Sequence, residues 1–204
     1  MNINSNKILG FVATLILLIF LSSCKEDIPV NDDIKNYNTL NTSTYPDYLY
    51  NVNLVGTKHN EYLDSMYAKL SRMKSDVESQ SNTPLVNFMI NEAVIFADNN
   101  GFDVTNVDTT GLTDSYYDTL SISSFLDTNS FLSQAAENIL YQLDSTLNVY
   151  ANDGMTLMQF EAYCDMQITI AYSLRSSTEA YIVGLTLSVA KNSANYWNSS
   201  MTIG

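Results

Sequence analysis

Apolar residues recur at intervals of three and four along most of this chain, which is the spacing of one face of an α-helix. A first apolar stripe, Tyr62 to Val77, follows Gly56. A second helix is predicted to start at Thr83-Pro84, with threonine as the cap and proline in the first turn, and to stop at Asn99-Asn100-Gly101. A third stripe runs from Phe131 to Leu147.

Two capping-box patterns predict where the last two helices begin. They are Thr156-x-x-Gln159 and Ser176-x-x-Glu179, in which each side chain of the pair satisfies an orphan amide. The last helix carries no charge from Ala180 to Ala190, which is typical of a helix at the centre of a bundle. Gly184 within it costs about 1 kcal/mol of helix propensity, so we expect a neighbouring helix to approach closely there.

These patterns together predict an all-α domain. No strand-length stretch alternates between apolar and polar residues, and residues 101–129 have the irregular, Thr- and Asp-rich composition of a long loop. The expected fold is an irregular bundle of about five helices, counted from the apolar stripes.

The amino terminus has the pattern of an export signal. Lys7 precedes an uncharged run, Ile8 to Leu21, that is short for a membrane span. The following Leu21-Ser22-Ser23-Cys24 resembles the lipobox of bacterial lipoproteins. This resemblance implies cleavage before Cys24 and lipid chains on that cysteine, and so a membrane partner through the anchor.

The residues after the lipobox predict where the anchored protein lies. Lys25-Glu26-Asp27 resembles a short signal that carries some lipoproteins to the cell surface, which implies an outer-membrane location. Residues 24–50 are rich in Asn, Asp and Thr, and we interpret them as a flexible tether, although Tyr45 to Tyr50 is aromatic enough to dock on the domain. The predicted organisation is a signal peptide at 1–23, the tether at 24–50 and a helical domain at 51–204.

Charge restricts the partners. The chain has 9 basic and 22 acidic side chains, and loss of Lys7 with the signal leaves 8 and 22, a net charge of −14. Such a surface repels phosphate backbones, so we expect no nucleic-acid partner. A protein or glycan partner remains open. Because 46% of the residues are hydrophobic, the chain can build a core and is not a disordered acidic tail.

His59, the single histidine, is the first candidate for chemistry. It could act as a general base with Glu61 or Asp64 beside it. The alternative, which we favour, is a buried structural histidine, because its helical neighbours on one face are apolar: Tyr62, Leu63 and Met66.

Other reactive or metal-binding patterns are weaker. Cys164 lies on the apolar stripe of the fourth predicted helix, where a thiol is usually buried and inert. With Cys24 lipidated it has no intrachain partner. Asn152-Asp153-Gly154 is better explained as a turn than as a calcium loop, since Val149 and Phe160 would occupy ligand positions. We therefore predict no metal and no cofactor.

Two segments resemble a group of secreted helical bacterial proteins. The first is Val55-Gly56-x-x-His59-Asn60-x-x-Leu63-Asp64 and the second is Ser188-Val189-Ala190-x-x-Ser193-Ala194-x-Tyr196-Trp197. The resemblance implies no activity, but it suggests one site that contains His59, Asn60 and Trp197. The alternative is that Trp197 caps the bundle.

These observations favour a surface-exposed, lipid-anchored binding or interaction module over an enzyme. Two alternatives stay open. One is a hydrolase that uses His59 with a nearby carboxylate, and the other is a toxin-type or immunity-type factor, for which no residue gives direct evidence.

Overall fold

The all-α prediction is confirmed. The structure is a computed structural model that describes residues 44–72, 82–100, 122–123, 126, 132–152 and 154–201. Within this part of the chain it contains helices and no strand, and its five long helices are α2 (Tyr45–Arg72), α4 (Asn82–Asn99), α7 (Gln134–Asn152), α8 (Leu157–Tyr172) and α9 (Ser177–Met201). The expected signal peptide, Cys24 and Lys25-Glu26-Asp27 lie outside the described residues.

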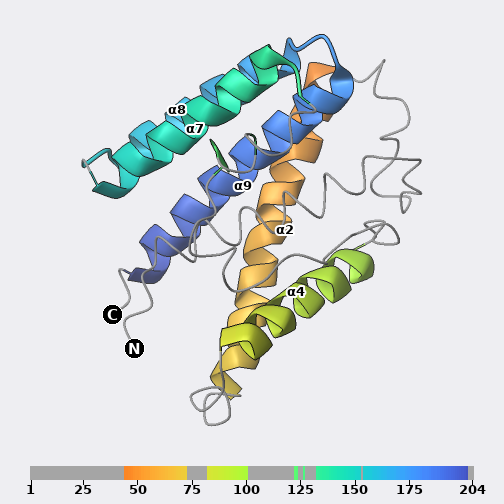
Figure 1. The fold of residues 1–204 in the computed structure, drawn as a ribbon, viewed down its shortest axis with the longest axis vertical. Helices are drawn as coiled ribbons and strands as arrows, with labels where there is room; N and C mark the ends of the chain where they lie inside the picture. Colours follow the sequence, from red (N-terminus) through yellow and green to blue (C-terminus); the bar gives the residue numbers. More distant parts are fainter. Residues whose placement is uncertain are drawn as a thin grey trace.

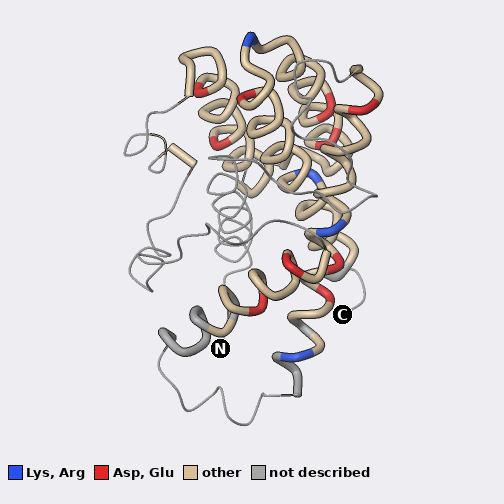
Figure 2. The backbone as a smooth tube through the Cα atoms, turned by 90° about the vertical axis from the view of Figure 1, so that its right-hand side faces the viewer, with Lys and Arg blue, Asp and Glu red and all other residues tan. Residues whose placement is uncertain are grey.

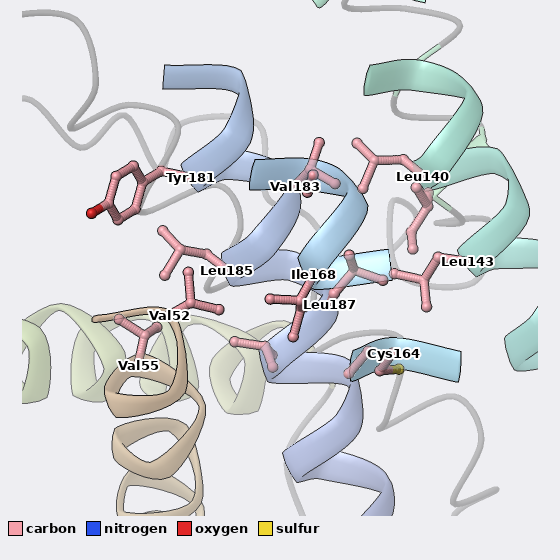
Figure 3. Packing of buried hydrophobic residues seen from close by; sticks show 14 of the residues in the cluster. Val52, Val55, Leu140, Leu143, Cys164, Ile168, Tyr181, Val183, Leu185 and Leu187 are labelled. Atoms are coloured by element: carbon pink, nitrogen blue, oxygen red, sulfur yellow. The ribbon is translucent and has the colours of Figure 1, made fainter. Parts of the chain in front are cut away.

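Helix α9 is central, as its uncharged sequence predicts. Helices α7 and α8 lie side by side as a hairpin, and α9 packs against this hairpin on one side and against α2 on the other (Figure 1). Every residue from Ala180 to Ala190 is buried. Figure 3 shows how Leu187 of α9 lies among side chains of the neighbouring helices, including Val52 of α2 and Ile168 of α8.

Helix α2 begins at Tyr45, six residues before the domain start predicted at residue 51, so its first turns lie in the segment that we interpreted as a tether. The carboxylate of Asp47 accepts a hydrogen bond from the backbone N–H of Thr44 at 3.3 Å and another from the Thr44 hydroxyl at 2.7 Å. These bonds cap the first turn of α2. Tyr48 is only 1% exposed, and its hydroxyl donates to the carbonyls of Ile168 and Ala180. The first turns of α2 contain several polar residues, so the apolar spacing of a helix could not be recognised there.

The two capping boxes differ in outcome. At α8 the predicted box is present, because Thr156 and Gln159 exchange hydrogen bonds between side chain and backbone. At α9 the Ser176 hydroxyl accepts the N–H of Glu179, at 3.3 Å, but the Glu179 carboxylate does not return the bond. It accepts instead from the backbone N–H and the hydroxyl of Ser133, just before α7. The start of α7 is thereby tied to the first turn of α9.

Gly184 marks a close approach between helices, as its place in a helix interior predicts. A Cβ atom at this position would overlap the hydroxyl of Tyr48 and lie 3.1 Å from a methyl group of Val52. Helix α2 therefore crosses α9 at a point where no side chain fits. Closer packing of α2 on α9 offsets the helix propensity that α9 loses by having glycine at position 184.

Candidate functional site

The two segments that the sequence singled out meet in the structure. Residues 55–64 of α2 run along residues 188–197 of α9, and small side chains line the contact. A Cβ atom on Gly56 would overlap the hydroxyl of Ser188 and the amide of Asn192. The two helices therefore approach closely, and this α2–α9 seam brings polar groups from both into contact.

His59 lies inside the seam and is only 2% exposed. Its Nδ1 atom is 3.2 Å from the side-chain oxygen of Asn60 and 3.3 Å from the hydroxyl of the buried Ser193. Burial lowers the pKa of His59 to about 4, and the hydrogen bond with Asn60 opposes this shift without cancelling it. The imidazole is therefore neutral near pH 7 and is held by uncharged groups.

The carboxylates that could assist His59 have other partners in the described contacts. Glu61 forms an ion pair with Lys58 at 2.7 Å, and Asp64 accepts a hydrogen bond from the Tyr196 hydroxyl at 2.8 Å. A general base needs a partner that orients it and a path to its substrate. In the part of the chain that the structure describes, His59 contacts no carboxylate.

Asn60 belongs to the same seam, and Trp197 lies farther along α9. The Asn60 amide donates to the backbone carbonyl of Asn192 at 3.1 Å, which fixes the register of α2 on α9. Trp197 follows Ser193 by one helical turn, packs against the core, and makes an edge contact with Tyr196, with ring centroids 5.4 Å apart. The seam therefore holds His59 and Asn60, whereas Trp197 packs against the core near the end of α9.

Cys164 lies in the core and is fully buried. Burial raises the pKa of its thiol to about 12, and the nearby Asp165 adds to this shift. The thiolate is the nucleophilic form of cysteine, so a thiol of this kind is unreactive at neutral pH. Among the described residues, no group of His, Cys, Asp and Glu side chains is arranged to hold a metal ion.

A shallow depression on the α7–α8 hairpin is a second candidate that the sequence did not indicate. Its volume is about 400 Å³, and every residue that lines it is uncharged and can form hydrogen bonds: Asn138, Tyr141, Gln142, Ser145, Thr146 and Tyr163. These side chains come from two helices. Each is ordinary by itself, so no local motif could have revealed the depression.

Helix α8 also has an exposed apolar stripe opposite its buried face. Met158, Met166 and Ile170 are 76%, 53% and 44% exposed. The predicted apolar stripe that contains Cys164 is the buried face of this helix, and the apolar spacing did not reveal the second, exposed one. The two acidic residues within this helix are directed toward α9, where Glu161 accepts from Asn195 at 2.8 Å and Asp165 pairs with Lys191 at 2.6 Å.

Comparison with protein-family models, curated proteins and solved structures finds no match. The candidate sites are therefore judged on their own geometry. Across the described helices, acidic positions outnumber basic ones (Figure 2). No helix in this described part is both long enough and apolar enough to cross a bilayer.

Proposed function

We propose that this protein is a lipid-anchored binding module of the outer membrane, exposed at the cell surface, and not an enzyme. The anchor is the lipid on Cys24, and Lys25-Glu26-Asp27 is the export signal. The domain binds an uncharged partner through the outer face of the α7–α8 hairpin. This hairpin outer face consists of the depression and the exposed stripe of α8.

The depression is the observation that carries this proposal. Ligand sites are hollows of a few hundred Å³ in which a few polar groups converge on the ligand. Here amide and hydroxyl groups of α7, among them Asn138 and Gln142, line the hollow together with Tyr163 of α8, whose own hydroxyl is buried. A hollow without charge, on a mature chain with a net charge of −14, suits a neutral ligand such as a glycan or an uncharged segment of a protein.

The geometry around His59 favours binding over catalysis. The histidine is buried, its neighbours are the neutral Asn60 and Ser193, and Glu61 and Asp64 have other partners. The hydrolase alternative needs His59 to meet both a carboxylate and a substrate. No observation favours a toxin-type or immunity-type factor.

The proposal can be tested by cross-linking in intact cells. A photoreactive amino acid at Ser145, within the depression, is compared with the same group at the exposed Asn91 on α4. We expect adducts from position 145 that are several-fold more abundant, and mass spectrometry identifies each as protein, glycan or lipid. Equal or absent adducts at the two positions would contradict a binding role for this face.

A matched pair of charge variants sharpens the test. Asn138→Asp places a carboxylate in the depression with almost no change in shape, and Asn91→Asp does the same on α4. If the ligand is uncharged, desolvation of the new carboxylate should reduce cross-linking several-fold for the first variant. The second should have no effect, and an equal loss in both variants would argue against a neutral ligand at the depression.

A further inference from the structure

The exposed stripe of α8 has the regular spacing of a contact surface. Met158, Ala162, Met166 and Ile170 recur at every fourth position, and all four are exposed. Residues at this spacing lie on the same side of a helix. On this side Gln159, Thr169 and Ser173 are uncharged, and the charged neighbour Asp165 is paired with Lys191 of α9 at 2.6 Å. A helix that is apolar on a second, solvent-facing side is typical of contact with another apolar surface.

The segment that follows the predicted lipid anchor reaches the domain near the carboxyl end of α8. Thr44, the first residue of this part of the domain, follows Cys24 by only 20 residues in the sequence. Tyr45, the first residue of α2, lies against the end of α8. Its hydroxyl is 3.0 Å from that of Thr169, and its ring centroid is 5.1 Å from that of Tyr172. The anchored chain therefore enters the domain beside Thr169 and Tyr172, near the carboxyl end of α8, where the stripe also ends.

Charge also favours this face as the one turned to a membrane. The domain is strongly acidic, so carboxylates repel it from anionic lipid and lose hydration at any bilayer. On α8 the two acidic side chains are bonded to α9: Glu161 accepts from Asn195, and the charge of Asp165, beside the stripe, is paired with that of Lys191. Tyr172, which is 37% exposed beside the incoming chain, is of the residue type that collects at lipid headgroups.

We infer that the outer face of α8 rests on the bilayer that holds the Cys24 lipid, with Met158, Met166 and Ile170 at the boundary of the acyl chains. Tyr163, in the depression, precedes Met166 by three residues, so the depression borders the stripe and lies at the level of the headgroups. Its neutral hydrogen-bonding groups suit a zwitterionic headgroup. This inference rests on the proposed anchor and names the partner of the proposed binding face.

The test uses the full lipidated protein in phosphatidylcholine vesicles. An environment-sensitive fluorophore is attached to Met166→Cys or, as the control, to Asn91→Cys on α4. The buried Cys164, whose thiol pKa is about 12, does not compete for the label. We expect lipids that carry a quencher in their acyl chains to quench the label at position 166 several-fold more strongly than the label at position 91.

The outcomes separate the inference from the anchor on which it rests. Failure of the protein to float with the vesicles contradicts the anchor and the inference together. Flotation with equal quenching at both positions contradicts the inference alone. Disulfide dimers of the unlabelled Met166→Cys protein after air oxidation, with no quenching of the labelled protein, would overturn the inference and assign the face to a second copy of the chain.

A charge variant provides an independent check. Met166→Glu should reduce quenching of a label at Ile170→Cys several-fold, because a carboxylate resists entry into the acyl boundary. The matched Asn91→Glu should leave that quenching unchanged. Unchanged quenching in the Met166→Glu protein would overturn the inference, and circular dichroism of both proteins checks that they remain folded.

Discussion

The hydroxyl of Ser193 on α9 lies 3.3 Å from Nδ1 and 3.4 Å from Nε2 of His59 on α2, and both side chains are buried. The hydroxyl faces the imidazole at the centre of the α2–α9 seam. A buried imidazole requires partners for its ring nitrogens, and Ser193 and Asn60 are within reach of them. This arrangement accounts for the presence of His59 through its contribution to the stability of the fold, without a catalytic role.

His59→Ala should therefore destabilise the domain. We expect a loss of roughly 1–3 kcal/mol in the free energy of unfolding, from the lost hydrogen bonding and a small cavity. His59→Gln should recover part of this, since an amide can replace one bond. Lys58→Ala is the matched control, because its exposed ion pair with Glu61 contributes at most about 1 kcal/mol. An unchanged melting temperature in His59→Ala would reopen a catalytic site.

The stability of the fold should depend on pH through His59. Burial lowers the pKa of the folded-state imidazole to about 4, whereas in the unfolded chain it is about 6.5. The unfolded state therefore binds a proton first as the pH falls. Stability is at its full value above about 6.5, and roughly 3 kcal/mol of it is lost as the pH falls to about 4. Denaturant unfolding of the wild type and of His59→Gln across this range measures the effect. The wild type should be the more stable protein near pH 7 and should lose this advantage as the pH falls, because glutamine does not titrate.

The positions of helices could be predicted where apolar residues recur regularly. They could not be predicted where contacts with residues far away in sequence decide where a helix begins. The stripes and the Thr156 box located four helices closely, because periodicity and capping are local properties. The start of α2 was missed because Tyr48 gains its stability from carbonyls of Ile168 and Ala180, far away in sequence. Glu179 likewise caps α7 because Ser133 lies beside it in space, which no local pattern encodes.

Gly184→Ala should destabilise the domain by about 1–3 kcal/mol, the usual range for overpacking. The new methyl group would overlap the Tyr48 hydroxyl, which is held by two backbone carbonyls and cannot easily move. A double-mutant cycle with Tyr48→Phe identifies the cause. Because Phe lacks the overlapping hydroxyl, the double variant should lose less stability than the sum of the two single variants. Strict additivity would place the clash elsewhere.

The candidate site was only partly predictable for a similar reason. The two segments with His59, Asn60 and Trp197 could be singled out, and they do meet along α2 and α9. Whether His59 is structural or catalytic depends on its burial, and the apolar residues near it on the helix predicted that burial. The depression could not be predicted, because it forms only where Gln142 of α7 lies beside Tyr163 of α8. The exposed stripe of α8 could not be predicted either, because it depends on which side of α8 is covered by α9.

The lipid anchor predicts a specific amino terminus. Mass spectrometry of the mature protein should find Cys24 as the first residue, carrying acyl groups, because the lipobox ends at this position. Several acyl chains are expected, since one chain alone gives only marginal and reversible membrane binding. Cys24→Ala should leave an unprocessed or soluble protein. A mature terminus at another residue, without lipid, would contradict the anchor.

Surface exposure makes a separate prediction, which tests Lys25-Glu26-Asp27. If the proposed export signal operates, the folded domain lies outside the outer membrane, and protease added to intact cells should remove it. A variant with all three residues changed to alanine keeps Cys24 and should keep its lipid, but it should be protected until the cells are lysed. An inner-membrane or periplasmic marker, resistant before lysis in both strains, controls for leakage. Full protection of the wild-type protein would place the anchored domain in the periplasm and would reject the surface location while leaving the lipid anchor intact.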